Sequence, residues 1–330
     1  MHIGLAAMLE HAPPQDVLAQ VQRAEAAGFR GVMASDHFQP WLPRHGAASH
    51  VWSMLGAIGT LTTGDLGPGV TTPTFRTHPA VVAQAAATLS AMFPRRAWLG
   101  LGSGEALNEH ITGEYWPEAP ERIERMFEAV DLIRKLFTAS RAGRDVRHTG
   151  PHFRLESTRL WTMPEQAPDL FIATAGPQTA RRAGRVADGL ITTAAAPERL
   201  ESLLARFGEG AREAGRDPST MHRIVQIHLS WAPTDEEAAQ QALAEWPMAG
   251  MRFRRSDVRS PFELEQLARL VRPDDMTSGI VASADPDVHR AAIQRLADIG
   301  FDRIYLHNVA RGNDEWLDVF GRDVLPHIHS

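Results

Sequence analysis

Short apolar runs alternate with amphipathic helical patterns along the whole chain. The apolar runs cover residues 3–8, 31–34, 67–72, 97–102, 169–173, 188–192, 224–229 and 303–307. Between them, apolar residues recur at helical spacing, as over residues 51–61 and 118–137. Short apolar runs separated by helical patterns indicate parallel strands joined by crossover helices. Eight such units predict an α/β protein with the (β/α)8 TIM-barrel fold.

An open, doubly wound sheet is the main alternative to a barrel. Such a sheet would carry a glycine fingerprint directly after its first strand. The first apolar run is followed instead by Glu10-His11-Ala12-Pro13-Pro14. We therefore expect one barrel domain over residues 1–330.

Two stretches depart from the repeating pattern. Residues 144–168 alternate polar and apolar positions on both sides of Gly150-Pro151, which predicts an inserted hairpin. Residues 247–275 are polar and irregular, with Arg252, Arg254 and Arg255 ahead of a short helix. We expect this second insertion to cover the C-terminal face of the barrel, where substrates enter.

Composition narrows the classes of function. The net charge of −6 argues against a nucleic-acid-binding face, which would be basic. The chain has no cysteine, so any redox role needs a bound cofactor. No apolar stretch reaches membrane-spanning length, and the N-terminus lacks a secretory pattern. We expect a cytoplasmic homodimer that acts on a small molecule, without nucleic-acid or membrane partners.

Polar residues follow most of the predicted strands, at the end where barrel active sites lie. They are Glu10 and His11, then Asp36, His37 and Trp41, then Thr71 and Thr72, then Ser103, Gly104, Glu105 and Asn108, then Thr174, Thr192 and Thr193, and finally His307 and Asn308. Singly, such residues are often helix caps, turn formers or core groups. Together, an Asp-His pair, a carboxylate and a tryptophan at one mouth favour an active site, with histidine as proton acceptor.

Other patterns are weaker. The segment Ala175-Gly176-Pro177-Gln178-Thr179 opens a helix and is compatible either with phosphate binding or with a plain connection. Residues 100–105 are rich in glycine but lack the dinucleotide spacing. No metal site is expected, because the first strand lacks a His-x-His pair and the other histidines do not share a helix face.

Two motifs identify a family likeness. Residues 35–41 (SDHFQPW) and 102–109 (GSGEALNE) closely resemble the signatures of deazaflavin-dependent glucose-6-phosphate dehydrogenases. These enzymes belong to the luciferase-like superfamily and use coenzyme F420. The likeness extends through residues 72–80 and 183–189 and covers nearly the whole chain.

The resemblance implies a role for each matching residue. Asp36 would contact the deazaflavin ring, His37 and Glu105 would be the acid–base candidates, Trp41 would stack near the reacting carbon, and Glu10 would complete the pocket. Gly69-Val70 occupies the position of a non-proline cis peptide bond behind the ring. The remaining cofactor-binding positions are Gly102, Ser103, Asn108, Ala175, Gly176 and Pro177.

The sequence also departs from this family. The sugar-phosphate enzymes place lysines around the substrate phosphate, whereas Lys135 is the only lysine here and residues 192–196 read TTAAA. Glucose 6-phosphate is therefore not the expected substrate. Residues 108–113, 226–233, 271–275 and 304–309 resemble a second luciferase-like subgroup of flavin- or F420-dependent oxidoreductases, for which FMN is the alternative cofactor.

These observations lead to one main hypothesis and two alternatives. The main hypothesis is an oxidoreductase that transfers a hydride between the cofactor ring and an alcohol or carbonyl. The alternative enzyme is an FMN-dependent monooxygenase that uses reduced flavin and oxygen. A barrel that binds a flavin without turnover is the alternative outside catalysis.

Overall fold

The structure is a computed structural model that describes residues 1–253, 255–276, 279–312 and 314–329. Its strands are β1 His2–Ala7, β2 Gly31–Ala34, β3 Asp65–Pro68, β4 Trp98–Leu101, β5 Val146–Thr149, β6 Arg154–Thr158, β7 Asp169–Ala173, β8 Gly189–Thr193, β9 His222–Ser230, β10 Val281–Ala282 and β11 Arg303–Asn308. Its α-helices are α1 Pro14–Ala26, α2 Val51–Leu61, α3 Pro79–Met92, α4 Ala106–Glu109, α5 Ala119–Arg141, α6 Pro177–Val186, α7 Pro197–Glu213, α8 Asp235–Glu245, α9 Pro261–Ala268, α10 Pro286–Ile299 and α11 Glu315–Asp323.

Eight parallel strands form the central barrel. Their order is β3-β2-β1-β11-β9-β8-β7-β4, and the short strand β10 pairs with β9. Isolated parallel bridges from Leu66 to Ala97 and from Thr71 to Leu101 join β3 to β4, so the ring is nearly closed. Each predicted apolar run corresponds to one of the eight strands. The predicted TIM-barrel fold is therefore confirmed.

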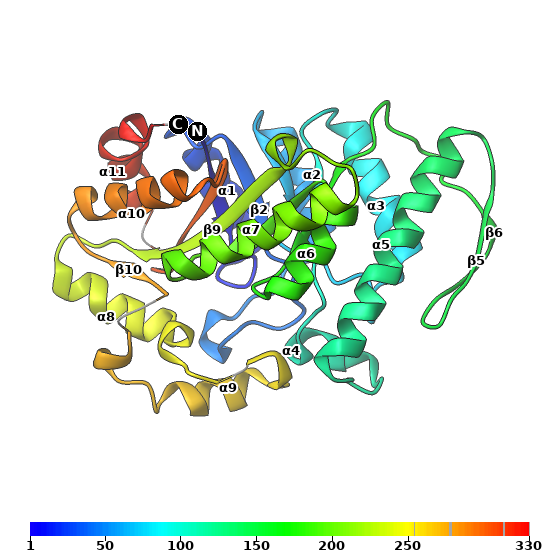
Figure 1. The fold of residues 1–330 in the computed structure, drawn as a ribbon. Coiled ribbons are helices and arrows are strands. Elements are labelled where there is room, and N and C mark those ends of the chain that lie inside the picture. Colours follow the sequence, from blue (N-terminus) through cyan, green and yellow to red (C-terminus); the bar gives the residue numbers. More distant parts are fainter. Residues whose placement is uncertain (254, 277–278, 313, 330) are drawn as a thin grey trace.

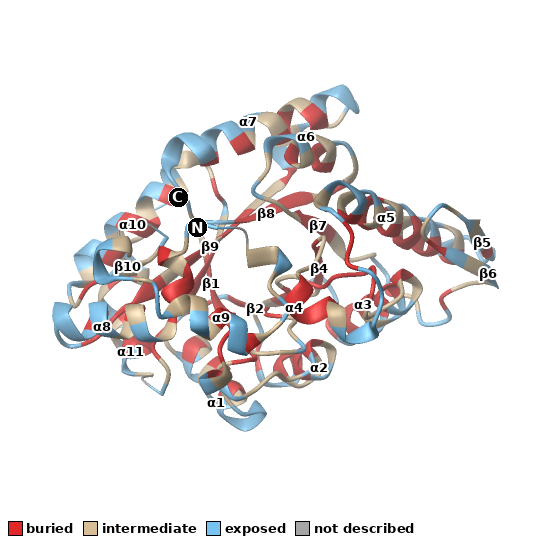
Figure 2. Cartoon of the chain, turned by 90° about the horizontal axis from the view of Figure 1, so that it is seen from below, coloured by how far each residue is buried: buried red, intermediate tan, exposed pale blue. Residues whose placement is uncertain are grey.

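The interior of the barrel is filled by side chains. Met33, Trp98, Phe171 and Tyr305 belong to one buried cluster, and the Trp98 ring centroid lies 5.6 Å from that of Phe171. Figure 2 shows the strands largely buried, with the helices around them exposing their outer faces. Because the core is packed, a ligand must bind at the end of the barrel rather than along its axis.

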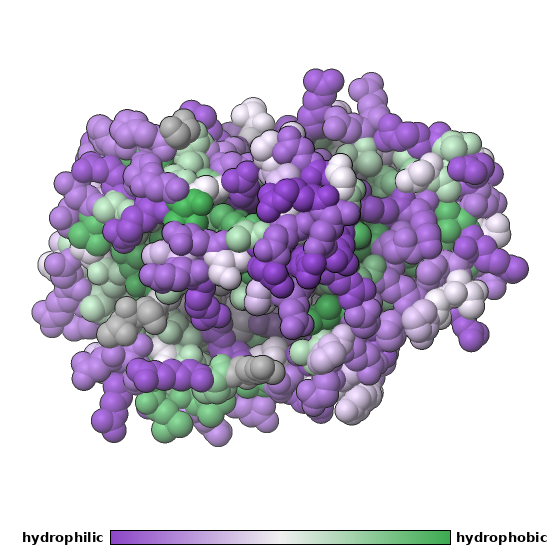
Figure 3. All heavy atoms as spheres, viewed as in Figure 1, coloured by the Kyte–Doolittle hydropathy of each residue, from purple (hydrophilic) through white to green (hydrophobic). Residues whose placement is uncertain are grey.

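Helices cover the outside of the sheet. Several of them, including α3 and α7, begin with proline, which suits the first turn because no intrahelical partner exists there for its missing N–H. The hydrophilic face drawn in Figure 3 carries only scattered hydrophobic side chains. Within the described part of the chain, no helix is long and apolar enough to cross a membrane.

The stretch at residues 144–168 contains the predicted hairpin. β5 and β6 form a two-stranded antiparallel sheet, which projects beyond α5 on the side away from α8 and α10 (Figure 1). Its distance from the strand ends excludes it from the mouth of the barrel.

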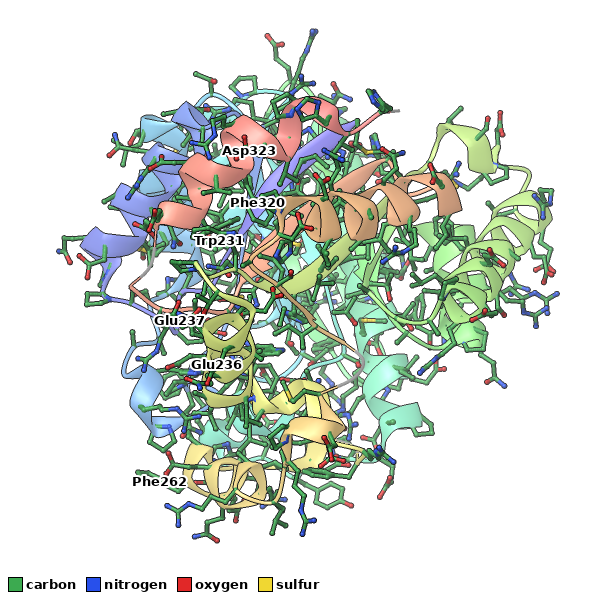
Figure 4. The ribbon with its side chains drawn as sticks, turned by 90° about the vertical axis from the view of Figure 1, so that its left-hand side faces the viewer. Trp231, Glu236, Glu237, Phe262, Phe320 and Asp323 are labelled. Carbon is green, nitrogen blue, oxygen red and sulfur yellow. The ribbon has the colours of Figure 1, made fainter. Side chains whose placement is uncertain are left out.

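The stretch at residues 247–275 packs onto the mouth. Its Met248 and Leu264 are buried in one cluster with Trp41, which follows β2. In Figure 1, α9 and α4 lie at the end of the molecule opposite the chain termini. Phe262, on the outer side of α9, is 67% exposed and points away from the barrel (Figure 4). The stretch is thus amphipathic. The sequence predicted its polar residues but not the apolar side that is buried.

The arginines predicted in this stretch differ in environment. Arg252 is largely exposed and lies 3.7 Å from Asp275. Arg255 points inward over the Trp41 ring, at 5.6 Å from its centroid. Arg254 lies outside the described residues.

Candidate active site

A cavity of about 320 Å³ opens at the C-terminal ends of the strands. Ten of the thirteen site residues that the resemblance implied line it, namely Asp36, His37, Trp41, Gly69, Val70, Gly102, Ser103, Glu105, Asn108 and Ala175. They come from the ends of β2, β3, β4 and β7, which lie far apart in sequence. The barrel brings them together because parallel strands direct all their C-terminal ends to one face.

The other three residues of that set do not line this cavity, nor do the predicted strand-end residues His11, Thr71, His307 and Asn308. Glu10 is completely buried behind it, where it accepts a hydrogen bond from the Ser35 hydroxyl. Ser35 in turn accepts a hydrogen bond from the backbone N–H of Leu9, at 2.8 Å. Glu10 thus supports the segment that precedes Asp36. Gly176 and Pro177 lie at the start of α6, next to the lining residue Ala175.

The Asp36 carboxylate is held on both oxygens. Thr71 Oγ1 donates to Oδ2 at 2.8 Å, and Arg76 Nη2 lies 3.2 Å from Oδ1. Arg76 also donates through Nε to Glu109 Oε1 at 2.9 Å. Only 8% of the Asp36 side chain is exposed. Its orientation at the cavity wall is therefore fixed by charge and hydrogen bonding.

His37 is placed by contacts on two sides. Its ring centroid lies 4.9 Å from that of Trp41. Its Nδ1 lies 3.3 Å from the Gln39 carbonyl oxygen and 3.3 Å from Asn108 Nδ2. Depending on the tautomer, Nδ1 either donates to the Gln39 carbonyl or accepts from Asn108 Nδ2, and in both cases Nε2 is the ring atom left for a reacting group.

Asn108 joins the loop after β2 to α4. Its Oδ1 accepts from the backbone N–H groups of Phe38 at 3.0 Å and of Gln39 at 3.3 Å. The Gln39 side chain returns a hydrogen bond to the Leu107 carbonyl at 2.7 Å. Asn108 is 4% exposed, so its side of these bonds is shielded from water. The pair of elements that carries His37 and Glu105 is thereby held as one unit.

One wall of the cavity includes two glycines that pack closely against neighbouring side chains. The peptide bond between Gly69 and Val70 is cis, as the resemblance implied. A Cβ at Gly69 would lie 2.2 Å from Met33 Cγ, and one at Gly102 would lie 2.7 Å from Val70 Cγ2. Real Cβ atoms do not approach their neighbours so closely, so a larger residue at either position would displace Met33 or Val70 from this wall.

Glu105 lines the cavity at the start of α4, near the partly buried cation Arg255. Arg255 donates to the Met248 carbonyl at 2.9 Å, and its guanidinium faces Trp41. Burial lowers the pKa of Arg255, and the Glu105 carboxylate opposes that shift. The mouth therefore combines an acidic group with one cation that the sequence marked only as part of an arginine cluster.

The start of α6 offers fewer free donors to an anion than its sequence indicates. The Gly176 N–H donates to Thr174 Oγ1 at 3.0 Å. The side chains of Arg181 and Arg182 form ion pairs with Glu213 and Glu124, away from the cavity. Any phosphate here would rely on the helix N-terminus rather than on these arginines.

Buried aromatic rings and imidazoles lie behind Trp41. Trp246 packs edge-on against Trp41 at 5.8 Å and against His307 at 4.9 Å. The Nδ1 atoms of His307 and His228 are 2.8 Å apart, so one of them donates and the other accepts. Burial lowers the pKa of His228 and of His45, each to about 3. These histidines are neutral at pH 7.

Several contributors were not predicted as site residues. Gln226 and Ile191 line the cavity from the inner faces of β9 and β8. Their period-two alternation within an apolar run is the signal that assigns them to an inner face. Arg76 and Glu109 were recognised only as motif letters, because nothing in their spacing places them beside Asp36. Among the described residues, no group of three or more His, Asp or Glu side chains could hold a metal ion.

The barrel fold and a cavity at the strand ends are the features of a TIM-barrel enzyme. The chain belongs to the luciferase-like monooxygenase family, which it matches over residues 1–303. The predicted luciferase-like oxidoreductase class is therefore confirmed.

Individual relatives agree with this assignment. The chain is 35% identical to an F420-dependent glucose-6-phosphate dehydrogenase of Microbacterium testaceum, over 99% of this chain and 97% of the relative. It is 37% identical to an enzyme of the same name from Intrasporangium calvum, over 99% and 98% of the two chains. These relatives are F420 enzymes, as the resemblance implied.

Solved structures show the same fold. An F420-dependent secondary alcohol dehydrogenase, in complex with an F420–acetone adduct, matches with a TM-score of 0.93 and 33% identity, over 100% of this chain and 99% of that chain. The monooxygenase RslO1 from Streptomyces bottropensis matches over 100% of both chains, with a TM-score of 0.75 and 21% identity. The second likeness concerns the fold alone.

Proposed function

We propose that this protein is an F420-dependent oxidoreductase that interconverts a neutral alcohol and the corresponding carbonyl compound. The observation that carries the proposal is the grouping of Asp36, His37, Trp41 and Glu105 around one cavity. Relatives above 30% identity that carry F420 in their names support the choice of cofactor.

The residues of the cavity fit a flat, anionic cofactor. The cis Gly69–Val70 segment and Gly102 form a wall in which two of the three residues lack a side chain, and a ring system can lie against it. Asp36 and Asn108 supply polar atoms at the edge of that wall, and the start of α6 supplies N–H groups for a phosphate. When bound, F420 accepts or releases a hydride.

The chain itself supplies proton transfer and positioning. The His37 tautomer that donates Nδ1–H to the Gln39 carbonyl leaves Nε2 with a lone pair that can accept the proton of a substrate hydroxyl. Trp41 packs against His37 and shields it from water. Glu105 is the second group of the cavity that can exchange a proton.

The charges of the site favour a neutral substrate over a sugar phosphate. Among the described residues, the cavity is lined by the carboxylates of Asp36 and Glu105 and by no lysine or arginine. A phosphate dianion would be repelled by both carboxylates. Their counter-charges, Arg76 beside Asp36 and Arg255 over the Trp41 ring, do not line the cavity. The F420–acetone adduct bound in the related alcohol dehydrogenase supports a small alcohol or ketone.

Cofactor titration followed by turnover tests the proposal. Purified protein is titrated with F420 and with FMN, and F420 is then offered with propan-2-ol or with glucose 6-phosphate. We expect F420 to bind at micromolar concentration or tighter, and propan-2-ol but not the sugar phosphate to reduce it. Binding of FMN alone, with oxygen uptake, would instead establish the monooxygenase function.

A further inference from the structure

Arg76 lies between two carboxylates that come from different elements. Its Nη2 is 3.2 Å from Asp36 Oδ1, and its Nε is 2.9 Å from Glu109 Oε1. The exposed fractions of the three side chains are 12% for Arg76, 8% for Asp36 and 1% for Glu109. This array is one layer behind the cavity, because Asp36 lines the cavity and the other two residues do not.

Glu109 holds Arg76 in one position. Its Oε1 accepts from Arg76 Nε, while its Oε2 accepts from the Arg76 backbone N–H at 3.1 Å. The guanidinium therefore has little freedom about its own chain. Its Nη2 reaches Asp36 twice, at the carboxylate and, at 3.3 Å, at the backbone carbonyl. Arginine suits this arrangement because its planar fork presents several donors in fixed directions.

The second oxygen of Asp36 is held by a separate element. Thr71 donates to Oδ2, and the Thr71 backbone pairs on both sides with the strand-four segment, through Gly100 and Gly102 at 3.0 Å each. Asp36 thus has one oxygen held by Thr71 and the other by Arg76. Thr71 can fix the direction of the carboxylate, but only Arg76 brings positive charge.

The charge balance of the array depends on Arg76. The carboxylates of Asp36 and Glu109 outweigh the effect of burial and raise the pKa of Arg76 above its ordinary value. Burial raises the pKa of Glu109, and Arg76 opposes that shift. Without the guanidinium, two carboxylates would share a nearly dry site, and one of them would take up a proton.

We propose that Arg76, clamped by Glu109, is a positioning residue that holds the Asp36 carboxylate charged and correctly oriented toward the bound cofactor. The proposal rests on the proposed function insofar as F420 is the molecule that Asp36 meets. It predicts that Arg76 acts on cofactor binding only through Asp36.

A double-mutant cycle tests this dependence. F420 dissociation constants are measured from about pH 5 to 8 for wild type, Arg76→Met, Asp36→Asn and the double variant. We expect Arg76→Met to weaken F420 binding about tenfold at neutral pH. We also expect the variant to lose binding at a higher pH than wild type when the pH is lowered. In the Asp36→Asn background, the same change should alter binding by less than about twofold.

Two further variants complete the test. Arg125→Met is the matched control, because Arg125 is also on this side of the barrel but stacks on Phe75 and pairs with Glu121 without touching Asp36. It should leave F420 binding unchanged. Arg76→Lys keeps the charge but not the fork, so its affinity should fall between those of wild type and Arg76→Met. If Arg76→Met does not fold, the Arg76→Lys variant takes its place in the double-mutant cycle.

The results separate the two proposals. Equal weakening by Arg76→Met in both backgrounds would overturn the positioning role, since the residue would then act independently of Asp36. A wild-type protein that binds F420 but oxidises no alcohol would overturn the proposed function and leave the cycle readable. A wild-type protein that does not bind F420 would overturn both.

Discussion

At the scale of single residues, His37 and Glu105 are expected to carry proton transfer. His37→Ala removes the Nε2 acceptor, and Glu105→Gln keeps the shape of the side chain while removing its charge. We expect the histidine variant to lower kcat by about 10² to 10⁴, as for loss of a general base. The glutamine variant should lower kcat less. Steady-state kinetics with F420 and propan-2-ol measure both, and unchanged turnover in both variants would rule out this mechanism.

Gly102 tests the cavity wall at the same scale. A Cβ there would lie 2.7 Å from Val70 Cγ2, so Gly102→Ala must displace the wall. We expect F420 affinity to fall at least tenfold, with a cost in stability of about 1–3 kcal/mol from overpacking. Gly56→Ala, in α2, is the matched control, because no atom lies within 4 Å of its added methyl. It should keep affinity and gain about 0.5–1 kcal/mol.

At the scale of elements, one end of the barrel carries the cavity, and the polar contacts at the opposite end hold strands together. Asp65, at the start of β3, accepts from the Tyr305 hydroxyl at 2.8 Å and pairs with Arg303 at 3.1 Å. These groups are at the end opposite the cavity and tie β3 to β11. Burial raises the pKa of Tyr305 well above its ordinary value, so the hydroxyl remains a donor.

Asp65→Ala is therefore expected to affect stability rather than binding. It leaves a buried hydroxyl and a partly buried guanidinium without their acceptor, which costs about 3 kcal/mol. Denaturant unfolding should show this loss, whereas the F420 affinity of the folded variant should match wild type. Asp323→Ala, which breaks a surface ion pair with Arg322, serves as the control with little effect. A weaker affinity in Asp65→Ala would show that the two ends of the barrel are coupled.

The elements themselves were predictable, with differences at their ends. The third strand was expected over residues 67–72 but covers Asp65–Pro68. The pairing of β3 with β2 ends at Pro68. The Gly69–Val70 peptide bond that follows is cis, and Thr71 then pairs with Leu101 of β4. An apolar run in the sequence indicates burial, and burial continues through residue 72. It does not indicate where the ladder hydrogen bonds of the sheet end, and these end earlier.

At the scale of the whole molecule, the buried histidines set the response to acid. The unfolded chain protonates its imidazoles below about pH 6.5, whereas burial lowers the pKa of His45 and His228 to about 3 in the folded chain. The unfolded state therefore binds more protons, and stability is lost as pH falls through this window. The slope for each such histidine is on the order of 1.4 kcal/mol per pH unit.

Urea unfolding at about pH 7, 6 and 5 measures this loss. We expect His228→Asn to have a shallower dependence on pH than wild type. His327→Gln, at an exposed position near the C-terminus, is the control and should follow wild type. Parallel curves for wild type and His228→Asn would contradict a role of this histidine in acid sensitivity.

The sequence by itself determined the repeating strands and helices, the residue types at the strand ends and the family. These features follow from local periodicity and from contiguous motifs, which require no knowledge of distant contacts. The tertiary structure alone decided that Arg76 and Glu109 meet Asp36, that Arg255 faces Trp41, and that Glu10 lies behind the cavity rather than in its lining. Such contacts arise only when the barrel closes, because the partners are far apart in sequence and no local pattern records which side chains the closure brings together.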